Sequence, residues 1–103
     1  MKSLVKITAS SVKNKLNPSR LGSCFELFGF DFMMSAAAEV FLIEVNSNPC
    51  LELSSNLLEE LIPKMLDDTL ALTIDKAFPV ENYKPLKTTY GDTNLWEFMT
   101  QGL

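Results

Sequence analysis

Acidic side chains lie within two short apolar segments near the middle of this 103-residue chain. Asp31 lies in the first segment, at about 24–33, and Glu44 lies in the second, at about 40–46. A carboxylate within a run of large apolar residues is costly unless something pairs with it, and two carboxylates cannot neutralise each other. A bound cation is the simplest group that would compensate both, so these segments predict a metal site.

Strand geometry can bring these groups to one place. Side chains alternate faces along a strand, so Glu44 and Asn46 share a face. Pairing Asp31 opposite Glu44 leaves residues 36–39 as a four-residue hairpin connection, a common length. Directly opposed like charges destabilise a sheet, and one divalent ion between them would reverse that effect. Gly29, which has no side chain, is predicted to leave room for a ligand beside Asp31.

The spacing also leaves other interpretations open. A register slip of one residue would put the two carboxylates on opposite faces of the hairpin. Acids in apolar strands are also often edge residues or strand ends that face water. In addition, residues 34–41 contain no Gly, Asn or Asp, which is unexpected for a hairpin turn.

The residue types indicate a hard cation. Carboxylate and amide oxygens suit Mg²⁺ or Mn²⁺. The chain has no His and two Cys, so a zinc site of the usual kind is nearly excluded. Mg²⁺ usually binds one or two carboxylates and completes its shell with water and substrate phosphates. The sequence therefore favours nucleotide chemistry at Asp31, Glu44 and Asn46.

Two long motifs resemble the C-terminal part of the tubulin–tyrosine ligase family. They are CFELFGFDF at 24–32 and LIEVNSNPCLE at 42–52. The similarity extends upstream to VKNKLNPSR at 12–20 and downstream through LIPKMLDD at 61–68, so it covers about residues 5 to 80. The resemblance implies part of an ATP-grasp domain, in which Asp31, Glu44 and Asn46 bind the Mg²⁺ ions that hold ATP.

The resemblance also implies an activity. The family uses ATP to activate a carboxylate on a tubulin tail as an acyl phosphate, which an amino acid (tyrosine, glutamate or glycine) then attacks. Positioning and charge neutralisation by the metal suit phosphoryl transfer. Acidic tubulin or microtubule tails would be the partner, and the location would be cytoplasmic, at the cytoskeleton or in the cilium. The sequence does not separate the three amino acids.

The length of the chain argues against a complete ligase. A full member of the family is much longer and carries ATP-gripping lysines in an N-terminal part, and no Gly-rich phosphate loop occurs here. We therefore expect a fragment that is inactive alone, and the alternative is a catalytically inactive remnant or binding module that retains only the fold. The expected division is a ligase segment at 1–80 and an irregular tail at 81–103.

Composition excludes several other classes. The net charge is −4, and no apolar run approaches the roughly 18 residues of a membrane span. The two Cys are expected to be free thiols, with Cys50 buried. The first acid of the chain is Glu26, and five basic residues precede it: Lys2, Lys6, Lys13, Lys15 and Arg20. This uneven distribution of charge indicates either a surface for an acidic partner or the solvated side of a helix. This basic segment has no interleaved aromatics, which argues against nucleic-acid binding.

The expected fold class is α+β, with an antiparallel strand pair flanked by helices. Helical spacing predicts a helix at 2–16 that ends at Asn17-Pro18. A second helix is predicted to begin at Asn56 with Glu59 in a capping box, to be kinked or restarted at Pro63, and to bury one apolar stripe in a core. The members of this stripe are Leu58, Leu61, Ile62, Met65, Leu66, Thr69 and Leu72. Residues 94–99 could form one helical turn that docks Trp96 and Phe98.

Overall fold

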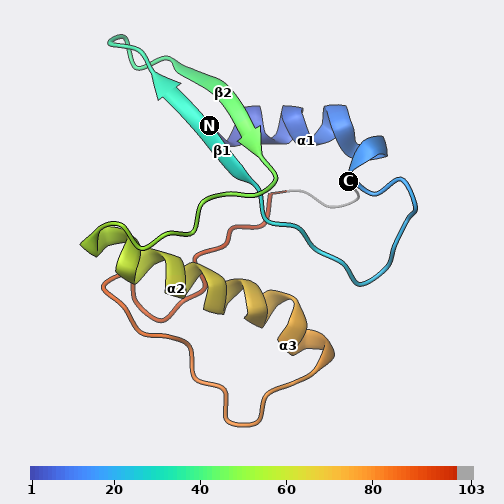
Figure 1. Cartoon of the computed structure of the whole chain (residues 1–103), viewed down its shortest axis with the longest axis vertical. Coiled ribbons are helices and arrows are strands. Elements are labelled where there is room, and N and C mark those ends of the chain that lie inside the picture. Colours follow the sequence, from blue (N-terminus) through green and yellow to red (C-terminus); the bar gives the residue numbers. More distant parts are fainter. Residues whose placement is uncertain (100–103) are drawn as a thin grey trace. The chain divides into compact units, whose positions relative to one another are not determined.

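The computed structural model describes residues 1–99 and has an α+β arrangement of short elements (Figure 1). The elements in chain order are α1 (Lys2–Leu16), β1 (Gly29–Met34), β2 (Val40–Asn46), α2 (Asn56–Leu72) and α3 (Ile74–Ala77). The chain divides into two compact units. Unit 1 comprises Met1–Cys50 with Phe98 and Met99, and unit 2 comprises Leu51–Glu97.

Helix α1 has the bounds that its apolar spacing predicts. Its C-cap is Asn17, directly before Pro18, whose ring disfavours helical geometry at the preceding residue. Lys13 and Lys15 lie in the last turn, where positive charge interacts favourably with the helix dipole. The Thr8 hydroxyl donates to the Leu4 carbonyl at 2.8 Å, as hydroxyls within helices commonly do.

Strands β1 and β2 form an antiparallel hairpin with the predicted pairing of Asp31 opposite Glu44. The predicted start of the first strand at residue 24 is wrong. Gly29 pairs with Asn46, the last residue of β2, so residues 24–28 have no partner strand. Phe32 pairs with Leu42, which leaves Ile43 as an extra residue in β2. This β-bulge shifts the pairing by one residue on the turn side.

The bulge also changes the turn. Met34 pairs with Val40, so five residues lie between the paired positions and the predicted four-residue connection is wrong. The Ser35 amide donates to the Glu39 carbonyl, and the Ala38 amide donates to the Ser35 carbonyl, both at 2.9 Å. Ala38 has a φ of 61°, in the left-handed region. A turn of this kind usually places glycine there, and here it forms with alanine.

Helix α2 is one continuous helix. Its N-cap is Ser55, whose hydroxyl accepts a hydrogen bond from the Leu58 amide at 3.3 Å. The helix begins at Asn56 as predicted, but the predicted capping box is wrong, because the cap is Ser55 and the residue three positions on is Leu58, which has no side-chain acceptor to complete a box. The helix does not restart at Pro63, which lies inside it. Pro63 has no backbone N–H, so one hydrogen bond of the helix is missing, and the helix still continues over 17 residues.

The predicted hydrophobic core is not present among residues 1–99. No apolar side chain in this part of the chain is fully buried, and the predicted stripe on α2 is only half-buried or exposed. A helix stripe is fully buried only when a second apolar layer covers all of it. The fully buried side chains are instead Lys64 and Asp68, which face the segment that follows α3.

The segment at 83–97 has irregular backbone and is held against α2. Residues 94–99 are not helical, which contradicts the expected helical turn. Trp96 docks onto α2, where its indole Nε1 donates to the Thr69 hydroxyl at 2.9 Å. Phe98 does not dock and is 79% exposed. Residues 100–103, the end of the predicted tail, lie outside the described residues, and the boundary predicted at residue 80 stays a prediction.

Candidate metal centre

The hairpin brings Asp31, Glu44 and Asn46 together on one face. Asp31 lies directly opposite Glu44, and Asn46 lies one alternate position further along β2, opposite Gly29. The Asn46 amide nitrogen donates to Asp31 Oδ2 at 2.9 Å and to Glu44 Oε1 at 3.3 Å. All three side chains therefore converge on one point, which excludes the slipped register.

The electrostatics of this point favour a positive group. Two like charges on directly opposed strand positions repel each other. The N–H bonds of the Asn46 amide point at both carboxylates and so present partial positive charge where a cation would neutralise them. One amide offsets only part of the repulsion, and both carboxylates keep free acceptor positions.

Two premises of the sequence argument are wrong. Asp31 and Glu44 are exposed, so neither carboxylate pays the burial cost that was taken to require a cation. The space beside Gly29 is also taken. A Cβ atom added at Gly29 would lie 3.0 Å from Pro49 Cβ and 3.8 Å from Asn46 Cβ. The glycine therefore admits the loop that follows β2, rather than a ligand.

The donor set fits a hard divalent ion that also binds phosphate. Within residues 1–99 no three or more His, Cys, Asp or Glu side chains gather into a metal cluster. The hairpin offers two carboxylates and one amide, and Mg²⁺ usually binds one or two carboxylates while substrate phosphates and water complete its shell. Rotation of the Asn46 amide would turn its oxygen toward such an ion.

A family model described as "Tubulin-tyrosine ligase family" matches residues 1–84. This chain belongs to the tubulin–tyrosine ligase family. The match includes the hairpin, α1, α2 and α3, and it ends within the segment that lies against α2. The resemblance that the motifs at 24–32 and 42–52 indicated is therefore confirmed, and members of the family use ATP and Mg²⁺.

Several curated relatives are similar to this tubulin–tyrosine ligase family chain. A tubulin glycylase 3B of Tetrahymena thermophila is 35% identical over 66 residues, which is 64% of this chain and 6% of the relative. A protein polyglycylase of Rattus norvegicus is 33% identical over 97 residues, covering 84% of this chain and 14% of the relative. A probable tubulin–tyrosine ligase of Saccharomyces cerevisiae is 34% identical over 65 residues.

The chain thus spans a small part of the length of these family members. No solved structure matches it. The part of the chain that the structure describes contains no helix long and apolar enough to cross a membrane.

The two cysteines of this family member are free, as predicted, and both are exposed. The expectation that Cys50 is buried is wrong, because the loop after β2 lies at the surface. The Cys24 thiol donates to the Leu21 carbonyl at 3.4 Å, a local contact within the loop after α1.

Sequence reasoning missed the charged face of α2. Lys64 is 0% exposed and Asp68 is 2% exposed, and Lys64 Nζ donates to Asp68 Oδ1 at 2.5 Å. The available signal was their spacing of four residues, which places opposite charges side by side on a helix. The sequence did not indicate that this face, rather than the apolar stripe, would be covered.

Proposed function

We propose that this chain supplies the Mg²⁺–ATP carboxylates of an ATP-dependent ligase that adds an amino acid to tubulin tails. Asp31 and Glu44 are the proposed metal-binding and cofactor-binding carboxylates, and Asn46 is the third ligand. The single observation that carries this proposal is the direct pairing of Asp31 with Glu44, with Asn46 joined to both. The match to the family model supports the reaction class.

The residues of this chain would act by positioning. With Mg²⁺ (or Mn²⁺) and ATP bound, the nucleotide supplies the phosphoryl group that activates a carboxylate. Asp31 and Glu44 would hold the metal from adjacent strands, so that its position is fixed by the hairpin register. Asn46, whose amide nitrogen donates to both carboxylates in the hairpin, would turn its amide oxygen to the ion as the third ligand. Placement and charge neutralisation of this kind provide most of the catalysis in phosphoryl transfer.

The names of several relatives indicate glycine as the amino acid that is added. The Tetrahymena relative and one from Drosophila melanogaster are named tubulin glycylases, and the rat relative is named a polyglycylase. We propose a glycine ligase that works on tubulin in the cytoplasm, at microtubules or in the cilium. Tyrosine and glutamate are the other amino acids that the family resemblance implies.

An acidic tubulin tail is the proposed partner, and the exposed basic residues of α1 support it. Lys6, Lys13 and Lys15 are exposed on α1, and Arg20 is exposed in the loop that follows. Exposed cations attract an acidic peptide. Salt weakens this attraction, because at 0.1 M ionic strength charges more than about 10 Å apart are largely screened from each other. Binding of a glutamate-rich peptide should therefore weaken as salt is raised, and should weaken further when the three lysines are replaced by glutamine.

A second candidate is an inactive relative that retains only the fold. One human relative, 39% identical over 51 residues, is named an inactive polyglycylase. Loss of activity within this family is therefore compatible with a sequence similar to this one. In that case the hairpin would persist without binding Mg²⁺–ATP.

Calorimetric titration of Mg²⁺–ATP into the full chain separates the two candidates. The first predicts binding that Glu44→Ala abolishes. Glu39→Ala is the matched control, because Glu39 is an exposed acid in the turn of the same hairpin. Equal binding by the wild type and Glu44→Ala would contradict the proposed site, and absence of binding by the wild type would support the inactive relative.

A further inference from the structure

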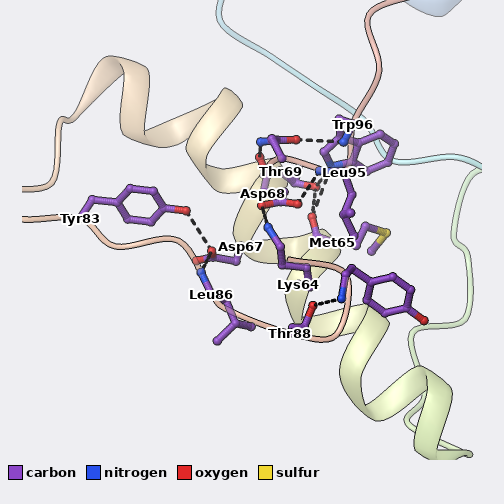
Figure 2. A network of polar contacts seen from close by, with 12 residues as sticks. Lys64, Met65, Asp67, Asp68, Thr69, Tyr83, Leu86, Thr88, Leu95 and Trp96 are labelled. Carbon is purple, nitrogen blue, oxygen red and sulfur yellow. Dashed lines mark hydrogen bonds and ion pairs between the residues drawn. The ribbon is translucent and has the colours of Figure 1, made fainter. Parts of the chain in front are cut away.

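A row of carboxylates on α2 holds the irregular segment 83–97 through its backbone. The Leu86 amide donates to Asp67 Oδ2 at 3.0 Å, and the Leu95 amide donates to Asp68 Oδ2 at 2.8 Å (Figure 2). The Thr89 amide donates to Glu60 Oε1. Irregular backbone has no strand or helix partners of its own, so these acids satisfy amides that would otherwise have only water.

Side chains add contacts at the same places. The Tyr83 hydroxyl donates to Asp67 Oδ2 at 2.9 Å, and the Thr89 hydroxyl donates to Glu60 Oε2 at 2.8 Å. At the far end of the segment, the Asn94 side-chain Nδ2 donates to the Asp68 backbone carbonyl at 3.0 Å. Two of the three acids thus bind both a backbone amide and a side chain of the segment.

The segment covers a buried charge. Lys64 has no exposed surface, and it lies amid the residues labelled in Figure 2 with its ammonium group on Asp68. Burying an ion pair costs desolvation energy that offsets much of its attraction. Leu86, Leu95 and Trp96 add partial apolar contact, since they are 41%, 37% and 42% exposed, but no apolar side chain of the segment is fully buried. A segment without a fully buried apolar side chain opens at a lower free energy than a packed core does.

Asp68 connects the buried ion pair to the segment. Its carboxylate binds Lys64 through one oxygen and the Leu95 amide through the other. Departure of Leu95 would admit water to Lys64, whose side chain lies one turn from both Glu60 and Asp68 on the helix. Burial of the Lys64–Asp68 pair therefore depends on the hydrogen bond between Asp68 and the Leu95 amide.

We propose that residues 83–97 form a strap that opens and closes on α2 as one unit, with the Lys64–Asp68 pair as its latch. Closure hides Lys64 and occupies the three carboxylates. Opening exposes a cation and three acids on one face of α2. Residues 85–97 lie outside the stretch that the family model matches, so the strap is a feature of this chain beyond that model. The inference is independent of the metal centre.

Amide hydrogen exchange in the full chain tests the strap. The Leu86, Thr89 and Leu95 amides should be protected to the same extent. Asp68→Asn weakens the latch at one end, and Glu60→Ala removes the acceptor of Thr89 at the other. Each variant should lower the protection of all three amides by about tenfold or more, as expected for loss of a hydrogen bond to a charged group. The α2 amides should keep their protection.

Glu59→Ala is the matched control, since Glu59 is an exposed acid beside Glu60 with no hydrogen bond to the strap, and it should leave all three amides unchanged. Loss of protection only at the amide whose acceptor was removed would overturn the proposal. If Asp68→Asn also unfolds α2, the Glu60→Ala variant decides, because Glu60 is not part of the buried pair. Equal loss of protection by α2 and the strap in that variant would also overturn it.

Discussion

The acids of the hairpin and the acids of α2 are arranged in opposite ways. In unit 1, Asp31 and Glu44 face each other with one amide between them and remain exposed. In unit 2, Asp67 and Asp68 bind backbone amides, and Asp68 is buried on a lysine. The α2 carboxylates are therefore engaged by the protein itself, whereas the hairpin carboxylates keep repulsion and free acceptors that a cation would remove. Of the two acidic regions, the hairpin is the one suited to a ligand.

The largest expected effect is at the latch of the strap. Asp68→Ala leaves the buried Lys64 ammonium without a partner and should lower the free energy of unfolding of unit 2 by about 3–5 kcal/mol. Urea unfolding followed by far-UV circular dichroism measures it. The double variant Lys64→Met with Asp68→Leu should restore part of the loss, because it removes both charges together but still leaves the Leu95 amide without its acceptor. A single variant as stable as the wild type would contradict the structural role of this pair.

The turn of the hairpin provides the next effect, with the opposite sign. Ala38 has a φ of 61°, a conformation that costs an L-residue about 1–2 kcal/mol. Ala38→Gly removes this cost, but glycine also raises the conformational entropy of the unfolded chain, which offsets part of the gain. The stability of the hairpin should therefore rise by about 0.5–1 kcal/mol. The spread of strand amide chemical shifts and the thermal midpoint of unit 1 report it. Ala36→Gly is the control, and it should not stabilise because Ala36 lacks a positive φ.

Neutralising one hairpin acid should stabilise rather than destabilise. Glu44→Gln removes the repulsion with Asp31 and should raise the stability of the hairpin by about 0.2–1 kcal/mol in metal-free buffer. The same variant should lose any stabilisation that Mg²⁺ and ATP give to the wild type. Thermal unfolding with and without Mg²⁺–ATP measures both effects. A destabilised Glu44→Gln variant would indicate that Glu44 is structural, as the α2 acids are.

The smallest effect is a change in titration at the edge of the strap. The hydrogen bond to Asp67, aided by the charges of nearby acids, raises the pKa of Tyr83 from 10.0 to about 12. Because the folded-state pKa is the higher one, this contact stabilises fully below pH 10 and is lost as the pH rises from about 10 to about 12. Ultraviolet absorbance of tyrosinate should show a step near pH 12 that Tyr83→Phe removes. Asp67→Asn should lower the pKa of Tyr83 and move this step to lower pH. A step at the same pH in Asp67→Asn would contradict the hydrogen bond between Tyr83 and Asp67.

Local patterns in the sequence predicted the hairpin better than the packing. The spacing allowed the pairing of Asp31 with Glu44 but left the register open, and the bounds of α1 follow from an apolar stripe that ends before Pro18. The bulge at Ile43 could not be predicted, because an extra residue in one strand leaves no mark in an apolar run. The convergence of Asn46 on both acids required only strand alternation.

The environment of the elements was not predictable in the same way. The stripe on α2 indicated a buried apolar face, but burial depends on what covers a helix. In unit 2 the strap fully buries Lys64 and Asp68, while its Trp96 lies against Thr69 of the stripe, which stays half-buried. The segment 83–97, with Pro85, Gly91 and three threonines, is interpreted as an irregular tail, since its contacts use backbone amides that leave no pattern in the sequence. The burial of Lys64 follows from those contacts.

Paramagnetic relaxation by Mn²⁺ tests the central claim most directly, because it locates a bound hard cation without requiring turnover. In nuclear magnetic resonance spectra of the full chain, Mn²⁺ added with ATP should broaden the amide signals around Asp31, Glu44 and Asn46 first. Glu44→Gln should remove that broadening, and Glu39→Gln should leave it unchanged. Broadening centred on Glu60 and Asp67 of α2, or broadening of the hairpin that persists in Glu44→Gln, would contradict the account.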